Sequence, residues 1–192
     1  FETACTISTT NVYASSPISI NKECGGQSNT LLRERSFGIF DVSAHEEYEA
    51  AAKAAGYGEG ENLYLYKPEG GEDKIEVQKR AAKFLNFLSQ TLIENLHLGK
   101  GCINDNQRVL VVSHGGLIVQ MTKYLLRQCK CDLSYLSKED KENILKDFAY
   151  LKNTAISNFE LVVDTNTGEI SSVRFLKFGN AHHLKAMTTI NG

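Results

Sequence analysis

A short apolar segment that ends in a histidine and two glycines constrains the fold of this chain more than any other feature. Residues 109–112 are four branched apolar side chains in a row, which suits a strand buried on both faces, as in a parallel sheet. Ser-His-Gly-Gly at 113–116 follows directly, and residues 117–129 then carry apolar side chains at helical spacing. The segment therefore predicts a strand, a tight turn and a helix in an α/β fold.

His114 stands at the turn of this unit. In open α/β sheets, ligands bind at the carboxyl ends of the strands, where helix N-termini present N–H groups and the positive end of the helix dipole. Gly115 and Gly116 would let the backbone approach an anion closely. An isolated histidine is more often structural or simply exposed, but this local context favours a histidine that handles phosphate.

The remaining elements are consistent with one α/β domain spanning residues 1–192. Capping and periodicity predict helices from 43 to 56, from 72 to 96 and from Ser137 to about Tyr150, and a hairpin of 155–163 and 169–178 around Thr-Asn-Thr-Gly. We expect a three-layer α/β sandwich. Its sheet would be mostly parallel, with helices on both faces and an antiparallel edge strand.

Composition excludes several classes of protein. The 192 residues are 42% hydrophobic and 23% charged, which is ordinary for a globular chain, and the net charge of −2 argues against nucleic acid as a partner. No apolar run approaches the length of a membrane span, and no polybasic patch suggests a membrane surface. The five cysteines show no paired metal-binding pattern, so we expect free or buried thiols in a reducing cytoplasm.

Four blocks in order resemble the histidine phosphatase superfamily, which has the phosphoglycerate-mutase-like fold. Residues 109–115 resemble its second-histidine motif, 31–38 its L-x-E-x-x-x-G block, 68–72 its P-x-G-G-E block, and 153–154 its late Asn-Thr pair. The resemblance is greatest to the fructose-2,6-bisphosphatases, which share the segment at 130–131 and the closing Asn-Ala-His-His-Leu. It implies hydrolysis of a sugar or glycerate bisphosphate that regulates glycolysis. A phosphoglycerate mutase is the alternative.

The resemblance also implies roles for individual residues. Glu34 would be the general acid that protonates the leaving oxygen, and His114 would donate a hydrogen bond to a phosphoryl oxygen. The remaining substrate-binding residues would be Arg35, Ser113, Gly115, Gly116, Asn153 and Thr154. We expect the ligand to be a small phosphorylated metabolite, and the implied phosphohistidine chemistry uses neither a metal nor another cofactor.

One motif of the family is not found. Members begin with a strand that ends in Arg-His-Gly, whose histidine is phosphorylated, and these three residues do not occur in sequence here. Residues 1–7 instead resemble the helix that follows the family's second strand. We therefore expect a chain that starts one strand–helix–strand unit late and is inactive as it stands. The alternative is a non-catalytic descendant that binds a phosphorylated ligand or a partner protein.

Overall fold

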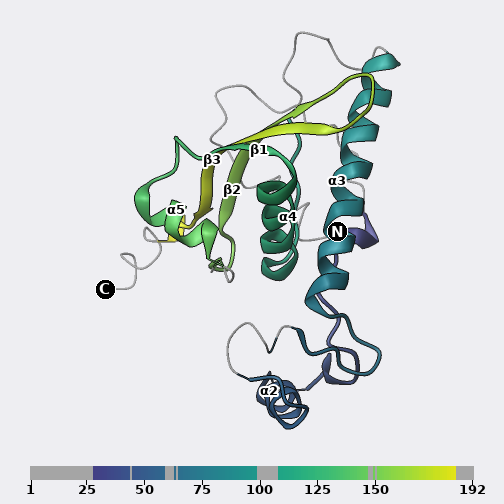
Figure 1. The fold of residues 1–192 in the computed structure, drawn as a ribbon, viewed down its shortest axis with the longest axis vertical. Coiled ribbons are helices and arrows are strands. Elements are labelled where there is room, and N and C mark those ends of the chain that lie inside the picture. The colour runs from purple at the N-terminus through teal and green to yellow at the C-terminus, as the bar shows by residue number, and fades with distance from the viewer. Residues whose placement is uncertain are drawn as a thin grey trace.

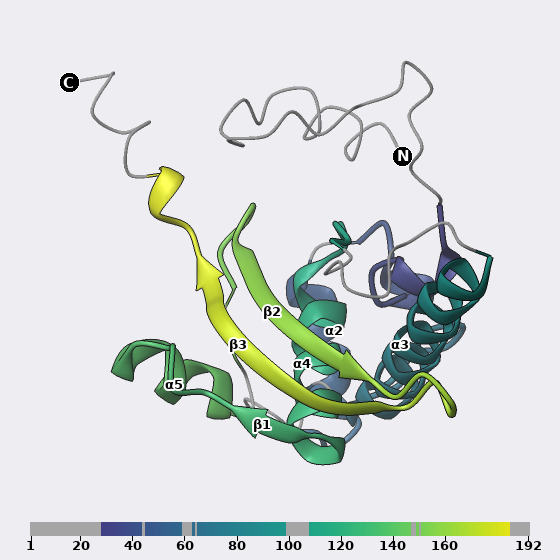
Figure 2. The same cartoon turned by 90° about the horizontal axis from the view of Figure 1, so that it is seen from above.

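The computed structural model describes residues 28–43, 45–58, 63, 65–98, 108–146, 149 and 151–184. The predicted helix tail at 1–7 lies outside these ranges. Within them the chain has a mixed α/β fold, in which the long helices α3 (Lys74–His97) and α4 (Gly115–Gln128) lie side by side next to a small curved sheet (Figures 1 and 2). No helix of the described ranges is long and apolar enough to cross a membrane.

The helices begin where capping chemistry is available. Asp73 and Glu76 form a reciprocal capping box at the start of α3, which satisfies two backbone N–H groups that the helix itself cannot. The predicted Ala-rich helix is α2 (His45–Ala54), which is followed by Gly56 at a φ of 87°. Short 3-10 turns occupy η1 (Thr30–Leu32), η2 (Gly38–Phe40) and η4 (His182–Leu184).

The helix α5 (Lys138–Leu145) is shorter than predicted. The Ser137 hydroxyl accepts from the Asp140 N–H, as expected of an N-cap, but the helix ends at Leu145 and Lys146 is extended. Residues 147, 148 and 150 of the predicted helix lie outside the described residues. The ammonium of Lys123, on α4, donates to the carbonyls of Ile144 and Lys146 at this point. These carbonyls would otherwise lack partners at the helix end.

The sheet is three-stranded in the described residues. β1 (Lys130–Asp132), β2 (Ile156–Val163) and β3 (Ile170–Asn180) lie in the order β1–β3–β2. β1 pairs parallel to β3, and the predicted hairpin pairs β2 with β3 antiparallel, so the expected antiparallel edge strand is confirmed. One of the two pairings among the described strands is parallel, so this part of the sheet is mixed.

The predicted strand at 109–112 is wrong. Residues 108–114 have no strand pairing in the structure, and Val109 and Leu110 are 50% and 69% exposed. A strand depends on a neighbour that pairs with its N–H and C=O groups, and no described segment pairs with this one. The helix that follows is formed as predicted.

The core lies between the two long helices and the sheet. It joins the buried faces of α3 and α4 to β3, where Val173, Phe175 and Phe178 are at most 1% exposed. The first turns of α3 and α4 therefore have fixed positions relative to each other. The segment from η1 to η2 packs beside these turns and forms the site described next.

Candidate active site

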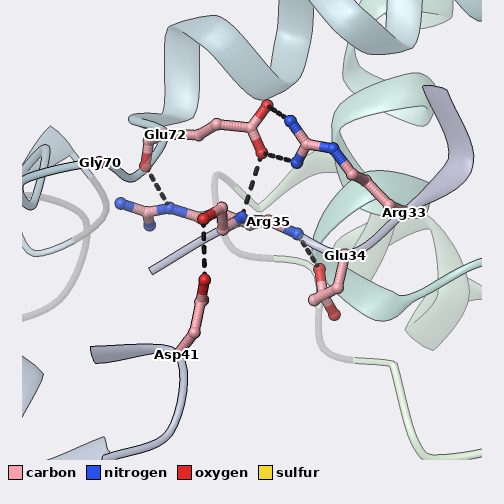
Figure 3. Close-up of a pocket in the computed structure, with 7 residues that line it drawn as sticks. Arg33, Glu34, Arg35, Asp41, Gly70 and Glu72 are labelled. Carbon is pink, nitrogen blue, oxygen red and sulfur yellow. Dashed lines mark hydrogen bonds and ion pairs between the residues drawn. The ribbon is translucent and has the colours of Figure 1, made fainter. Parts of the chain in front are cut away.

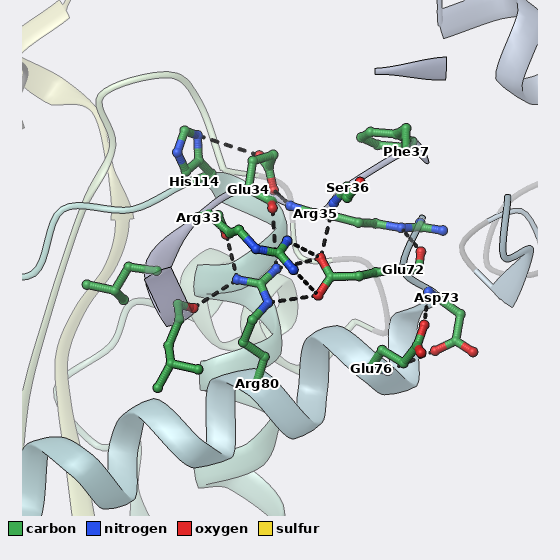
Figure 4. Close-up of polar contacts among 12 residues, drawn as sticks. Arg33, Glu34, Arg35, Ser36, Phe37, Glu72, Asp73, Glu76, Arg80 and His114 are labelled. Carbon is green, nitrogen blue, oxygen red and sulfur yellow. Dashed lines mark hydrogen bonds and ion pairs between the residues drawn. The ribbon is translucent and has the colours of Figure 1, made fainter. Parts of the chain in front are cut away.

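Glu34 and His114, which lie 80 positions apart in the sequence, meet at the start of α4. His114 is the N-cap residue of α4, and its Nδ1 lies 3.8 Å from Glu34 Oε2 (Figure 4). Both side chains are about half exposed, at 55% and 41%. Of the five histidines, all within the described ranges, His114 is the one in ion-pair range of Glu34.

The two glycines at the start of α4 have different surroundings. A Cβ on Gly116 would lie 3.0 Å from Glu34 Oε1, whereas a Cβ on Gly115 would meet nothing within 4 Å. The missing side chain at Gly116 therefore lets the Glu34 carboxylate approach the positive end of the helix dipole. Glu34 Oε1 also accepts from the Arg35 N–H at 2.8 Å, which fixes the carboxylate further.

Ser113 ties the two segments of the site together. Its hydroxyl donates to the Leu32 carbonyl at 2.8 Å, so the residue before His114 is bonded to the turn before Glu34. The resemblance implies that Ser113 binds substrate. In the structure the hydroxyl proton of Ser113 is donated to the Leu32 carbonyl.

Arg35, for which the resemblance implies a role in substrate binding, is a buried residue. It is 6% exposed and donates to the Glu72 carbonyl at 2.7 Å, the Tyr66 carbonyl at 2.7 Å and the Tyr48 hydroxyl at 3.1 Å. Its guanidinium also lies 5.2 Å and 5.5 Å from the ring centres of Phe37 and Tyr48. The side chain thus joins the Glu34 segment to the segment before α3 and to α2, although it also borders both cavities described below.

Glu72 is the centre of an ion-pair network that the sequence did not reveal. Its carboxylate accepts two hydrogen bonds from Arg33 and two from Arg80, and a further one from the Ser36 N–H (Figures 3 and 4). Partial burial alone would raise the pKa of Glu72. The hydrogen bonds from Arg80, the Ser36 N–H and Arg33 outweigh it, so this pKa lies below its ordinary value.

Arg80 connects this network to the backbone of the block at 31–38, which contains Glu34. Its guanidinium donates to the carbonyls of Leu31 at 2.8 Å and Arg33 at 2.6 Å, and more weakly to that of Glu34 at 3.3 Å. Arg80 is 7% exposed on the apolar face of α3. A charged residue on an otherwise apolar helix face is the signal by which the sequence could have identified it.

The backbone conformation and surroundings of Gly38 explain why the block at 31–38 contains a glycine. It has a φ of 56°, and a Cβ there would overlap the Glu69 carbonyl. The close approach allows the Ile39 N–H to donate to the Glu69 backbone carbonyl at 3.1 Å. It also allows the Glu72 N–H to donate to the Ser36 backbone carbonyl at 2.9 Å. The two glycine-containing blocks at 31–38 and 68–72 are therefore one structural unit.

Glu34 borders two cavities. The larger, of about 470 Å³, is lined by Arg33, Glu34, Arg35, Ser36, Asp41, Gly70 and Glu72 (Figure 3). The second, of about 280 Å³, lies between the first turns of α3 and α4 and is lined by Glu34, Arg35, Phe37, Lys74, Val77, Gly115, Gly116, Val119, Gln120, Ala149 and Leu151. Within the described ranges, no three His, Cys, Asp or Glu side chains gather as metal ligands.

The structure does not bring Asn153 and Thr154 to this place. Both are exposed residues of the turn before β2, and neither is among the described residues that line the two cavities. Thr154 has a φ of 60°, and its hydroxyl lies 3.1 Å from His183 Nε2. Their binding role remains a prediction from the resemblance.

Comparison with known proteins supports the same classification. Residues 18–139 match the sequence model of the histidine phosphatase superfamily (branch 1). The chain is 26% identical to the fructose-2,6-bisphosphatase TIGAR of Mus musculus, across 87% of this chain and 70% of the relative. It is 30% identical to the same enzyme of Bos taurus, across 54% and 49%, and 26% identical to TIGAR B of Danio rerio, across 75% and 60%.

The match includes the residues that form the site. Glu34, Arg35, Glu72, Arg80 and His114 all fall within residues 18–139, whereas Asn153 and Thr154 lie beyond them. The chain spans 49–70% of the lengths of these three relatives. Since the match extends over more than half of its residues, the chain belongs to the histidine phosphatase superfamily, branch 1.

Proposed function

We propose that this chain carries the acid and phosphate-binding part of a phosphomonoester hydrolase that works through phosphohistidine. The observation that carries the proposal is the Glu34–His114 pair at the N-terminus of α4, beside two cavities. The most suitable substrate is fructose 2,6-bisphosphate, hydrolysed at the 2-phosphate. The names of the three relatives support this choice over a phosphoglycerate mutase.

The proposed reaction divides into two displacements. In the first, the histidine of the family's Arg-His-Gly motif attacks phosphorus, the bond from phosphorus to the alcohol oxygen breaks, and Glu34 gives that oxygen its proton. In the second, Glu34 takes a proton from water as the water attacks phosphorus and the N–P bond breaks. His114 and the N–H groups at the start of α4 stabilise the negative charge on the phosphoryl oxygens in both steps.

The local geometry suits these roles. Glu34 and His114 are both partly exposed, so a substrate can reach them, and Gly116 leaves the space that the carboxylate occupies. The Glu72–Arg80 network holds the backbone on either side of Glu34. The acid is therefore oriented before substrate arrives, which lowers the cost of reorganisation in the transition state.

The 192-residue chain contains no Arg-His-Gly, so we expect it to bind phosphate esters without turning them over. The test compares this chain with a chimera that places the family's Arg-His-Gly strand unit before Phe1. Phosphate release from fructose 2,6-bisphosphate, 2,3-bisphosphoglycerate and nitrophenyl phosphate would be measured for both. Turnover by the chimera alone supports the proposal.

Two other outcomes would change the proposal. Turnover by the chain itself that disappears on mutation of His45, His182 or His183 would identify another phosphoryl acceptor. A folded chimera that binds phosphate esters without hydrolysing them would favour a non-catalytic phosphate-binding descendant. The free thiols of Cys129 and Cys131 are consistent with the proposed cytoplasmic location, which localisation of a tagged protein would test.

A further inference from the structure

Arg35 uses its backbone and its side chain in different directions. Its backbone N–H donates to Glu34 Oε1 at 2.8 Å, while its side chain extends away from that carboxylate (Figure 3). The guanidinium ends among two backbone carbonyls and the hydroxyl of Tyr48. The position of the backbone donor to Glu34 therefore depends on what holds the guanidinium.

Two parts of the chain hold this guanidinium. Its Nε donates to the Glu72 carbonyl at 2.7 Å, in the segment before α3. Its Nη2 donates to the Tyr66 carbonyl at 2.7 Å and to the Tyr48 hydroxyl at 3.1 Å. Because the guanidinium is planar and its N–H groups keep a fixed arrangement, these bonds set both its plane and its direction.

The Tyr48 hydroxyl is oriented to accept from Arg35. Its single proton faces the Leu63 carbonyl at 2.6 Å, which is nearer than the Tyr66 carbonyl at 3.5 Å. An oxygen lone pair of Tyr48 then faces Arg35 Nη2. Tyr48 is 3% exposed, so this bond is shielded from water.

Tyr48 lies on α2, which stands apart from the sheet (Figure 1). Its ring belongs to an aromatic group and packs against four other rings at centre distances of 5.0–6.1 Å, those of Phe37, Phe40, His45 and Tyr66. No residue of α2 is among the described residues that line the two cavities. Tyr48 can therefore affect the site through Arg35 without contacting a substrate.

The position of the Glu34 carboxylate is closely constrained. Its Oε1 stands 3.0 Å from where a Cβ on Gly116 would lie, and its Oε2 is 3.8 Å from His114 Nδ1. An acid transfers its proton efficiently only within about 2.6–3.2 Å of the receiving oxygen. A small displacement of the Arg35 N–H is thus enough to change how Glu34 meets the leaving oxygen.

We propose that Tyr48 is a positioning residue for the acid: its hydroxyl fixes the Arg35 guanidinium, and the Arg35 backbone N–H in turn holds the Glu34 carboxylate toward the leaving oxygen. The inference rests on the proposed function, because it takes Glu34 as the proton donor. It gives the Arg35 side chain a role that requires no contact with substrate.

Hydrogen exchange tests the structural part of the inference in the 192-residue chain. Tyr48→Phe keeps the ring and its aromatic neighbours and removes the oxygen that binds Arg35. We expect the Arg35 amide hydrogen, followed by NMR, to exchange about tenfold faster in this variant, because the local opening that exposes it costs less. Tyr57→Phe is the matched control, since Tyr57 packs against Tyr66 in the same aromatic group at 5.5 Å. It should change the exchange rate less than about twofold.

Turnover tests the catalytic part. In the active chimera, Tyr48→Phe should lower kcat for fructose 2,6-bisphosphate about tenfold with little change in KM, because a misplaced proton donor affects the transition state more than binding. Nitrophenyl phosphate, whose leaving group needs no proton, should lose much less and reports the fraction of folded, active enzyme. Tyr57→Phe should leave both rates within about twofold of the parent chimera.

A double-mutant cycle shows whether Tyr48 acts through Glu34. In a chimera that already carries Glu34→Gln, Tyr48→Phe should lower the rate for fructose 2,6-bisphosphate less than about twofold, because no acid remains to be positioned. A further loss of about tenfold in that background would overturn the inference, since Tyr48 would then act independently of the acid. Equal losses for the two esters would also overturn it, because a general loss of structure lowers both.

The two measurements separate this inference from the proposed function. An Arg35 amide that exchanges at the same rate in Tyr48→Phe would refute the link from Tyr48 to Glu34, whatever the chimera does. A parent chimera without turnover, together with faster exchange in Tyr48→Phe and not in Tyr57→Phe, would refute the hydrolase and support the link from Tyr48 to the Glu34 carboxylate.

Discussion

Glu72 and Arg80 form a two-point ion pair across the start of α3, with Arg80 Nε 3.0 Å from Glu72 Oε1 and Arg80 Nη2 2.9 Å from Glu72 Oε2. Both side chains are largely buried, at 13% and 8% exposure. Arg80 also donates from this pair to the backbone carbonyls of Leu31, Arg33 and Glu34. The orientation of the proposed acid thus depends on a helix residue 46 positions later in the sequence.

Replacing Arg80 by Ala should destabilise the fold by about 3 kcal/mol, because it leaves the Glu72 carboxylate buried without its main partner. Arg33→Ala is the matched control, since Arg33 pairs with the same carboxylate but is 50% exposed. Its loss should cost less than about 1 kcal/mol. Urea unfolding followed by circular dichroism would measure both values, and equal losses would show that burial does not distinguish the two arginines.

The stability that Glu72 contributes should depend on pH. Its pKa is lowered in the folded state, so the contribution is present at neutral pH and is lost as the pH falls below the ordinary value of 4.5. Glu72→Gln should therefore be less stable than the unmodified protein at pH 7, and the difference should shrink as the pH falls through this range. Glu69→Gln, at an exposed neighbouring position, serves as the control. A difference that stays constant from pH 7 to pH 3 would contradict the ion-pair interpretation.

Alanine substitutions at Gly115 and Gly116 should have different effects on the site. The added methyl at Gly116 would lie 3.0 Å from Glu34 Oε1 and should shift the carboxylate by a few tenths of an ångström. In the active chimera we expect Gly116→Ala to lower kcat for sugar phosphates about tenfold, since small displacements of a positioned group are costly. Gly115→Ala meets open space and should retain most of the activity. The rate of phosphate release at saturating substrate would measure kcat for both variants. Equal losses in Gly115→Ala and Gly116→Ala would contradict the steric explanation.

Substitutions of the pair itself test the assigned chemistry. His114→Ala should lower turnover by about 10² or more, as for loss of a preorganised donor to the transition state. Glu34→Gln should lower it by about 10²–10⁴ for sugar phosphates and by less for nitrophenyl phosphate, whose leaving group needs no proton. If Glu34→Gln slowed both esters equally, Glu34 would not be the proton donor.

Local sequence patterns predicted most of the secondary structure. Periodicity, capping and turn residues correctly predicted the helix after His114, the long α3, the α2 helix that ends two residues before Gly56, and the β2–β3 hairpin. The prediction at 109–112 failed because an apolar run specifies only that a segment can be buried. Whether it becomes a strand depends on a pairing partner elsewhere in the chain.

The sequence by itself determined the chemistry available at the site: a histidine beside two glycines at a helix start, and a carboxylate within a recognisable block. The tertiary structure alone decided how the neighbouring charges are used. It directed Arg35 into the protein, made Glu72 the centre of an ion-pair network and placed Lys74 on the cavity beside Glu34. The physical reason is that the partner of a long charged side chain depends on which segments pack beside it, and here those partners lie 8 to 49 positions away.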